Sequence, residues 1–232
     1  MKLVALLPMK ANSERVKGKN FREFAGKPLF MWILDTLLSI DSIALVVINT
    51  DARHILAEYG VAQNDRLMIR DRKPELCGDA VSMNRVLEDD IKSVEADCYL
   101  MTHTTNPLLS ATTVLNAWEN YVCSQIDGSA DSLFTVNRVQ TRFYRADGSP
   151  VNHDPDNLVR TQDLEVWFEE NSNLYIFSRE SFASTGARIG KRPTMFEIRP
   201  QESMDIDDQA GWELAELVAL GARVYRNHCG SV

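Results

Sequence analysis

The chain has 232 residues, of which 44% are hydrophobic and 25% charged, so it is long enough for one globular domain with a sizeable core. Its formal net charge of −8 argues against nucleic acid or an anionic membrane as a partner. The apolar run at residues 3–7 is too short for a signal-peptide core or a membrane span, and we therefore predict a cytoplasmic protein.

The predicted elements alternate between short apolar strands and helical patterns. In chain order they are a strand at 3–7, a helix at 28–39, a strand at 44–48, helices at 54–59 and 81–91, a strand at 99–102, a helix at 113–122, strands at 133–136 and 174–177, a helix at 211–220 and a short strand at 223–225. This order predicts an α/β fold with a mostly parallel sheet and helices on both faces. Residues 138–170 lack clear periodicity and predict an inserted arm or flap within a single domain, 1–232.

The cysteines do not suggest a metal site. Cys77, Cys98, Cys123 and Cys229 form no CxxC pair and have no histidine beside them. We predict unpaired thiols in a reducing compartment.

The loop after the first strand carries the strongest local signal. Residues 8–20 read PMKANSERVKGKN and contain four cations, Lys10, Arg15, Lys17 and Lys19. Ligands of parallel sheets bind beyond the carboxyl ends of the strands, where backbone N–H groups and lysine charges can hold phosphates. The loop is neither a Walker A loop nor a GxGxxG turn. The alternative is a solvated basic loop without a ligand.

The residues from Lys10 to Asn20, followed by FAGKPL at 24–29, resemble the opening of the acylneuraminate cytidylyltransferases. The stretch SERVKGK at 13–19 is also similar to the related Kdo cytidylyltransferases. The resemblance continues in order to about residue 220. It implies a Rossmann-like nucleotidyltransferase sheet with a small dimerisation arm, a homodimer, and transfer of CMP from CTP to a 3-deoxy-keto-sugar acid, a sialic-acid-like nonulosonate, with release of pyrophosphate.

The resemblance also implies a nucleotide site. It gives catalytic roles to Lys10, Lys19 and Asp207, with Lys10 standing where the family usually has arginine. Nucleotide contacts are implied at Lys10, Ala11, Asn12, Ser13, Lys19, Asn20, Arg72, Asp79 and Ser82. An arginine with hydroxyl or backbone groups suits the edge of cytosine. For Arg72 the alternative is a surface ion pair.

The acidic segment SMDIDD at 203–208 resembles the S-I-D-I-D segment of the family. Asp205 and Asp207 alternate, so they lie on one side of an extended segment, where they could bind Mg²⁺ or another divalent cation. The alternative is that Asp207 and Asp208 cap the helix that begins near Ala210. Asp51 ends the segment NTD at 49–51, which resembles the S-T-D segment of the family. The alternative is that Asp51 is only a turn residue at the end of the second strand.

The acceptor segments depart most from the family. HTTNPL at 103–108 resembles Q-P-T-S-P-L, and FEENSNLYI at 168–176 resembles F-R-P-N-G-A-I-Y-I. Substrate contacts are implied at His103, Thr104, Thr105, Asn106, Asn171 and Asn173. Glu169 replaces an arginine that meets the sugar-acid carboxylate, so we expect Arg142, Arg145 or Arg160 to take its place, or an acceptor other than a standard sialic acid. A nucleotidyltransferase for another sugar or nucleotide and a degenerate, non-catalytic nucleotide-sugar-binding protein remain open alternatives.

Overall fold

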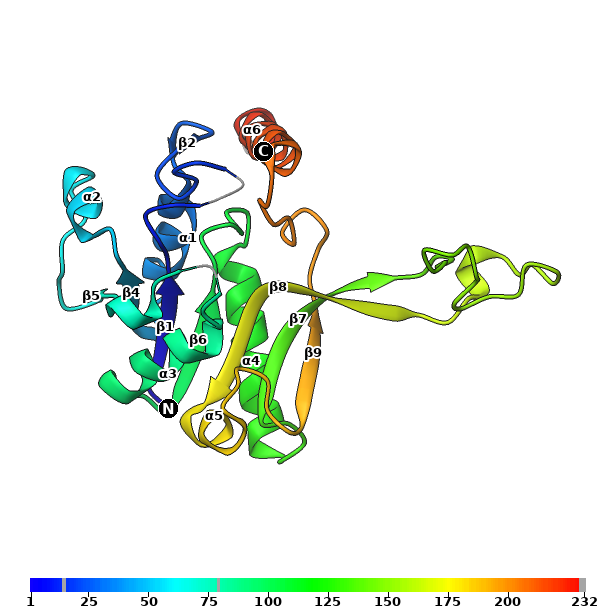
Figure 1. Cartoon of the computed structure of the whole chain (residues 1–232), viewed down its shortest axis with the longest axis horizontal. Coiled ribbons are helices and arrows are strands. Elements are labelled where there is room, and N and C mark those ends of the chain that lie inside the picture. Colours follow the sequence, from blue (N-terminus) through cyan, green and yellow to red (C-terminus); the bar gives the residue numbers. More distant parts are fainter. Residues whose placement is uncertain (14–15, 79, 230–232) are drawn as a thin grey trace.

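The computed structural model describes residues 1–13, 16–78 and 80–229, with the backbone alone from residue 223 onward (Figure 1). It confirms the predicted α/β fold, because one seven-stranded sheet is mostly parallel. The strands follow one another across the sheet in the order β5 (Leu67–Asp71), β4 (Ile43–Thr50), β1 (Leu3–Pro8), β6 (Cys98–Thr102), β8 (Trp167–Ser178), β7 (Ser132–Val139) and β9 (Pro193–Glu197). β8 runs antiparallel to both of its neighbours, and the other adjacent pairs are parallel.

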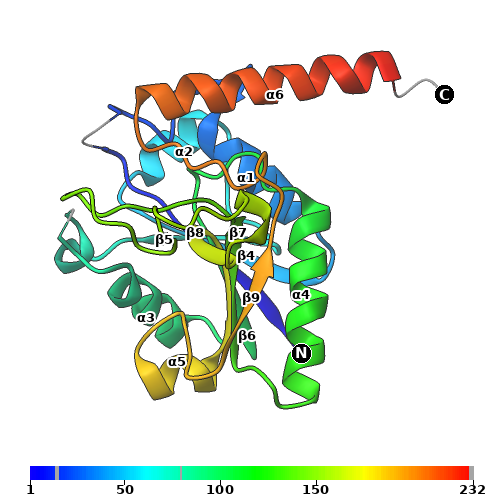
Figure 2. The same cartoon turned by 90° about the vertical axis from the view of Figure 1, so that its right-hand side faces the viewer.

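Helices cover both faces of this sheet (Figure 2). One face packs on α1 (Leu29–Leu38) and α4 (Ala111–Ile126), and the other on α3 (Met83–Ser93) and α5 (Arg179–Thr185). Every residue of β1 is buried, as expected for a continuous apolar strand with helices on both sides. Helix α2 (Arg53–Glu58) follows β4. Within the described residues, none of the helices is long and apolar enough to span a bilayer.

The last helix crosses the edge of the sheet where β1, β4 and β6 end (Figures 1 and 2). α6 (Gln209–Cys229) packs through Trp212 and Ala215 against the small hairpin of β2 (Glu23–Phe24) and β3 (Lys27–Pro28). The predicted strand at 223–225 is wrong, because the helical backbone continues through these residues. The run contains no proline that would end the helix.

Two strands of the seven-stranded sheet, the small hairpin of β2 and β3, and one α-helix were absent from the prediction. The edge strand β9 exposes every second residue and β5 exposes Met68 and Asp71, so neither is buried throughout. α5 is a short helix whose N-cap Ser178 accepts a hydrogen bond from the Ser181 N–H and whose C-cap Gly186 has a φ of 66°.

Residues 140–166 connect β7 to β8 and project sideways from the body (Figure 1), within the segment where we predicted an arm. A short 3₁₀ helix (Thr161–Asp163) lies in this connection. Hydrogen bonds within the connection include the one from the Val151 N–H to the Phe143 carbonyl at 2.9 Å.

Candidate functional site

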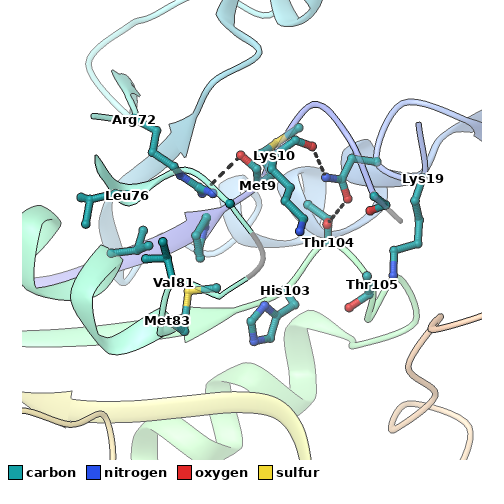
Figure 3. Close-up of a pocket in the computed structure, with 15 residues that line it drawn as sticks. Met9, Lys10, Lys19, Arg72, Leu76, Val81, Met83, His103, Thr104 and Thr105 are labelled. Atoms are coloured by element: carbon teal, nitrogen blue, oxygen red, sulfur yellow. Dashed lines mark hydrogen bonds between the residues drawn. The ribbon is translucent and has the colours of Figure 1, made fainter. Parts of the chain in front are cut away.

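A pocket of about 260 Å³ opens where β1, β4 and β6 end (Figure 3). It lies at the carboxyl edge of parallel strands, the position at which such sheets bind ligands. Eight of the predicted site residues line it: Lys10, Ser13, Lys19, Asn20, Arg72, His103, Thr104 and Thr105.

Asn20 joins two loops of the pocket. Its side-chain nitrogen donates to the Lys10 carbonyl at 2.7 Å, and its side-chain oxygen accepts from the Thr104 hydroxyl at 2.6 Å. The residue is 5% exposed, so these bonds are shielded from water. Asn20 therefore fixes the basic loop relative to the loop that follows β6.

Lys19 connects the basic loop to the acidic segment. Its Nζ donates to the Ile206 carbonyl at 2.5 Å and lies 4.0 Å from the Asp207 carboxylate. The Ile206 N–H in turn donates to the Thr105 carbonyl at 2.9 Å. Figure 3 shows the Lys10 and Lys19 side chains both extending toward the segment 103–105. Two cations thus line the pocket, and one of them, Lys19, joins it to the acidic segment.

The carboxylates of the acidic segment have different surroundings. Ile206 is fully buried, whereas Asp205 and Asp207 on either side of it are exposed, which agrees with the predicted alternation. Asp208 caps α6 by accepting from the Gly211 N–H at 2.8 Å. The capping alternative therefore fits Asp208, while Asp207 lies next to Lys19. In the described part of the chain, no group of three or more His, Cys, Asp or Glu side chains could hold a metal ion.

Arg72 lines the side of the pocket opposite Lys19, and several hydrogen bonds fix its guanidinium. Its guanidinium donates to the Asn49 side-chain oxygen at 2.9 Å and to the Asn49 and Met9 carbonyls at 2.8 and 3.3 Å. Asn49 donates in turn to the buried carboxylate of Asp90 at 2.7 Å. The same carboxylate also pairs with Arg70. Burial lowers the pKa of Arg72, while Asp51 raises it. Arg72 thus lines the pocket on a buried network instead of forming a surface ion pair.

Asp51 ties the second strand to the basic loop by accepting from the Ala11 N–H at 2.7 Å. This contact gives Asp51 a structural role in holding the loop. Asn12 is exposed and is not among the pocket-lining residues, and the predicted contact at Asp79 lies outside the described residues.

His103 is neutral at pH 7. Burial, together with the cations Arg188 and Lys19, lowers its pKa to about 4, and Asp207 only partly opposes this. The side chain borders the pocket from the end of β6. It is therefore suited to exchange hydrogen bonds with a ligand without adding positive charge.

The three predicted asparagine contacts do not line this pocket. The Asn106 and Asn173 amides donate to the carbonyls of Met204 and Glu202 at 3.4 and 2.8 Å, and Asn171 accepts from the Thr135 hydroxyl at 2.7 Å. These bonds hold the loop after β6, the strand β8 and the acidic segment together. Contact with a substrate stays a prediction for all three.

A second cavity of about 330 Å³ adjoins the pocket through Met83, which lines both. Its other lining residues are Ser82, Asn84, Glu170, Ala187, Arg188 and Ile189. Ser82, predicted to contact nucleotide, therefore lies on this side. The sequence around Arg188 did not predict a site residue. Arg188 follows a short turn, and it contacts β8 only in the folded chain.

The arginines expected to replace the one lost at Glu169 lie elsewhere. Arg142 donates to the Val159 carbonyl at 2.6 Å, Arg145 donates to the Pro150 carbonyl at 3.3 Å, and Arg160 pairs with Asp163 at 2.7 Å. All three bond within the projecting connection, and among the described residues none of them lines either cavity.

A family model described as "Cytidylyltransferase" matches residues 4–228. N-acylneuraminate cytidylyltransferase of Oncorhynchus mykiss is 27% identical over 219 residues, which cover 92% of this chain and 49% of that protein. The chain thus spans about half the length of the first curated relatives it matches. CMP-N,N'-diacetyllegionaminic acid synthase of Legionella pneumophila is 25% identical, with 93% of this chain and 95% of that protein covered.

Solved structures support the same fold. CMP:2-keto-3-deoxy-manno-octonic acid synthetase complexed with CTP has a TM-score of 0.65 at 16% identity, covering 97% of this chain and 100% of that one. 4-Diphosphocytidyl-2C-methyl-D-erythritol synthase from Anaerococcus prevotii also has a TM-score of 0.65, at 10% identity, covering 94% and 96%. Both the resemblance and the nucleotidyltransferase-like sheet predicted from the sequence are confirmed.

Proposed function

Because the chain belongs to the cytidylyltransferase family, we propose that it transfers CMP from CTP to a 3-deoxy-keto-sugar acid of the sialic-acid-like class and releases pyrophosphate. The observation that carries the proposal is that Lys10 and Lys19 line one pocket with residues 103–105, while Asp207 lies 4.0 Å from Lys19. The relatives named for acylneuraminate and for diacetyllegionaminic acid support the acceptor class.

The triphosphate is proposed to lie against the basic loop. Lys10, Ser13 and Lys19 line this end of the pocket and supply positive charge and hydrogen-bond donors. Lys10 acts as a point charge and lacks the bidentate fork of arginine. The cytosine end then falls toward Arg72 and the end of β1.

Mg²⁺, or another divalent cation, is part of the proposal. Mg²⁺ typically takes one or two carboxylates together with substrate phosphates and waters, so the exposed Asp205 and Asp207, the latter 4.0 Å from Lys19, fit its chemistry. When bound, such an ion neutralises phosphate charge and helps to orient the reacting groups.

The proposed reaction is one in-line displacement. The hydroxyl on the anomeric carbon of the acid forms a bond to the α-phosphorus of CTP and loses its proton to solvent, while the bond from that phosphorus to the bridging oxygen of pyrophosphate breaks. Lys10 and Lys19 stabilise the charge that develops on the phosphates, and the linked loops hold the reactants in line. His103, which is neutral, is suited to bond the attacking hydroxyl.

A homodimer and a cytoplasmic location are also proposed. Exposed apolar side chains on and beside the projecting connection, including Tyr144, Leu158, Val159 and Phe168, support an interface between two copies. Cys77, Cys98 and Cys123 are free thiols, as is usual in a reducing compartment.

The test is pyrophosphate release measured with each of the four nucleoside triphosphates, Mg²⁺ and a panel of 3-deoxy-keto-sugar acids. We expect release that requires both CTP and an acid, with no release when the acid is omitted. Turnover with another nucleotide, or with a sugar that has no carboxylate, would favour the alternative nucleotidyltransferase. Binding of CTP without turnover of any acid would favour the non-catalytic alternative.

A further inference from the structure

The second cavity contains a cation that neither the family resemblance nor the predicted arginines supplied. Arg188 lines it together with Glu170, and Met83 continues from this cavity into the nucleotide pocket. Arg188 also contributes to the low pKa of His103, so its charge acts on the end of the pocket where β6 stops. A positive charge therefore lies in the second cavity, close enough to the end of β6 to act on His103.

The position of this charge matters because of the structure of the proposed acceptor. In a 3-deoxy-keto-sugar acid, the carboxylate is attached to the same carbon that carries the attacking hydroxyl. The group that binds the carboxylate must therefore lie close to the α-phosphate. The exposed Glu169 that replaces the family arginine is bonded by the Asn137 amide at 3.0 Å, and its negative charge cannot attract an acid.

The Arg188 guanidinium is held in a defined place by β8. It stacks 4.0 Å from the centre of the Tyr175 ring, donates to the Tyr175 hydroxyl at 3.0 Å and lies 3.9 Å from the Glu170 carboxylate. Its side chain is 21% exposed, so water shields it only partly. A guanidinium has five N–H donors in a planar fork, which leaves room for a two-pronged bond to a carboxylate.

We propose that Arg188 binds the carboxylate of the sugar-acid acceptor and sets the preference of the enzyme for acids. The inference rests on the proposed function, since it assigns a residue to the acceptor side of that reaction. Tyr175 and Glu170 position the guanidinium, and the Tyr175 hydroxyl donates to the Glu170 carboxylate. Glu170 still offers oxygen acceptors to sugar hydroxyls, so the pair Arg188 and Glu170 suits a polyhydroxylated acid.

The competing explanation is that Arg188 serves only the packing of β8. A purely structural role would weaken all substrates alike and lower thermal stability. A carboxylate-binding role affects one substrate and one functional group of it. The test therefore compares substrates as well as variants.

The experiment measures KM for CTP, KM for the acid and thermal stability in the wild type, in Arg188→Gln and in Arg188→Lys. The acid is compared with its carboxamide, which has the same shape without the charge. Arg179→Gln is the matched control, because Arg179 also stacks on a tyrosine, 5.7 Å from the Tyr99 ring, and donates to its hydroxyl at 2.6 Å, but lines neither cavity.

We expect Arg188→Gln to raise KM for the acid by about 10- to 100-fold, the usual range for a lost hydrogen bond to a charged group, and to remove the preference for acid over carboxamide. KM for CTP should not change, and Arg179→Gln should leave both KM values unchanged. Arg188→Lys keeps the charge and should show a smaller loss of the same preference, which covers the case in which Arg188→Gln does not fold.

An unchanged KM for the acid, or an equal loss for acid and carboxamide, would overturn the assignment of Arg188 while the proposed function stands. Failure of the wild type to turn over any acid would contradict the proposed function, and this inference would fall with it.

Discussion

The two sides of the pocket are built differently. On the proposed nucleotide side, three hydrogen bonds tie together the basic loop and the segments at the ends of β4, β5 and β6: Asn20 bonds Thr104, Asn49 bonds Arg72, and Asp51 bonds the Ala11 N–H. On the proposed acceptor side, which is the second cavity, the Arg188 side chain contacts Tyr175 and Glu170 of the single strand β8 and is partly exposed.

The difference indicates what each side tolerates. A residue change on the nucleotide side disturbs loops that also form the edge of the sheet, so the fold and phosphate binding constrain the same residues. A change at Arg188 or Glu170 alters one cavity and leaves the strand ladder intact. We therefore expect the proposed acceptor preference to change more readily than the proposed nucleotide binding.

The largest expected effect is at Lys19, which lines the pocket and contacts the acidic segment. Lys19→Ala removes a charge that faces the proposed phosphates, and kcat/KM should fall by about 100- to 1,000-fold. Steady-state pyrophosphate release measures this. The matched control is Lys17→Ala, since Lys17 belongs to the same loop but is exposed and is not among the pocket-lining residues. Equal effects of the two variants would show that loop charge alone matters.

The next effect separates two neighbouring carboxylates. Asp207→Ala should raise the Mg²⁺ concentration needed for half-maximal rate by about tenfold or more, because a proposed metal-binding group is lost. Asp208→Ala should leave the Mg²⁺ requirement unchanged and lower the free energy of unfolding by about 0.5–2 kcal/mol, since it removes the cap of α6. Metal titration and urea unfolding of both variants check the pair. A Mg²⁺ requirement that changes only in Asp208→Ala would reverse the assignment.

A smaller effect is expected where the nucleotide-side loops join. Asn20→Ala leaves the Lys10 carbonyl and the Thr104 hydroxyl without this partner, so the free energy of unfolding should fall by about 1–3 kcal/mol. KM for CTP should rise, whereas the preference for acid over carboxamide should persist. Loss of that preference would contradict the division into two sides.

The smallest effect concerns pH and His103. Its pKa of about 4 lies below the ordinary value of 6.5, so the unfolded chain takes up a proton first as the pH falls. The stability of the wild type relative to His103→Gln should be constant above pH 7 and should decrease between pH 6.5 and 4. Urea unfolding of both proteins across this range measures the difference. A difference that does not vary with pH would mean that His103 has the same pKa in the folded and the unfolded chain, as a side chain surrounded by water would.

The sequence predicted the parts of the fold in which local pattern and environment agree. The buried run of β1 and the helix α4 are readable because their side chains face a core throughout or on one stripe. β5 and β9 were missed because half of their side chains face outward. The helical continuation at 223–225 was missed because three β-compatible residues do not show whether a helix has ended.

The same reasoning applies to the site. Lys10, Lys19 and Asp207 could be predicted because short motifs carry them; in the structure the two lysines line one pocket, and Asp207 lies next to Lys19. Arg188 could not be predicted, since its contacts with Tyr175 and Glu170 come from a turn folding back on β8. Motifs predict residues that are close in the chain, and the acceptor cavity is formed by residues that are distant in it.

The most direct test of the account is a crystal structure of the protein with CTP, Mg²⁺ and an unreactive acceptor acid. We predict that the triphosphate contacts Lys10, Ser13 and Lys19, and that the acid carboxylate lies on Arg188. A triphosphate bound away from the loop at 8–20, or an acid carboxylate bound at the Lys10 end, would contradict the proposed arrangement of the two sides.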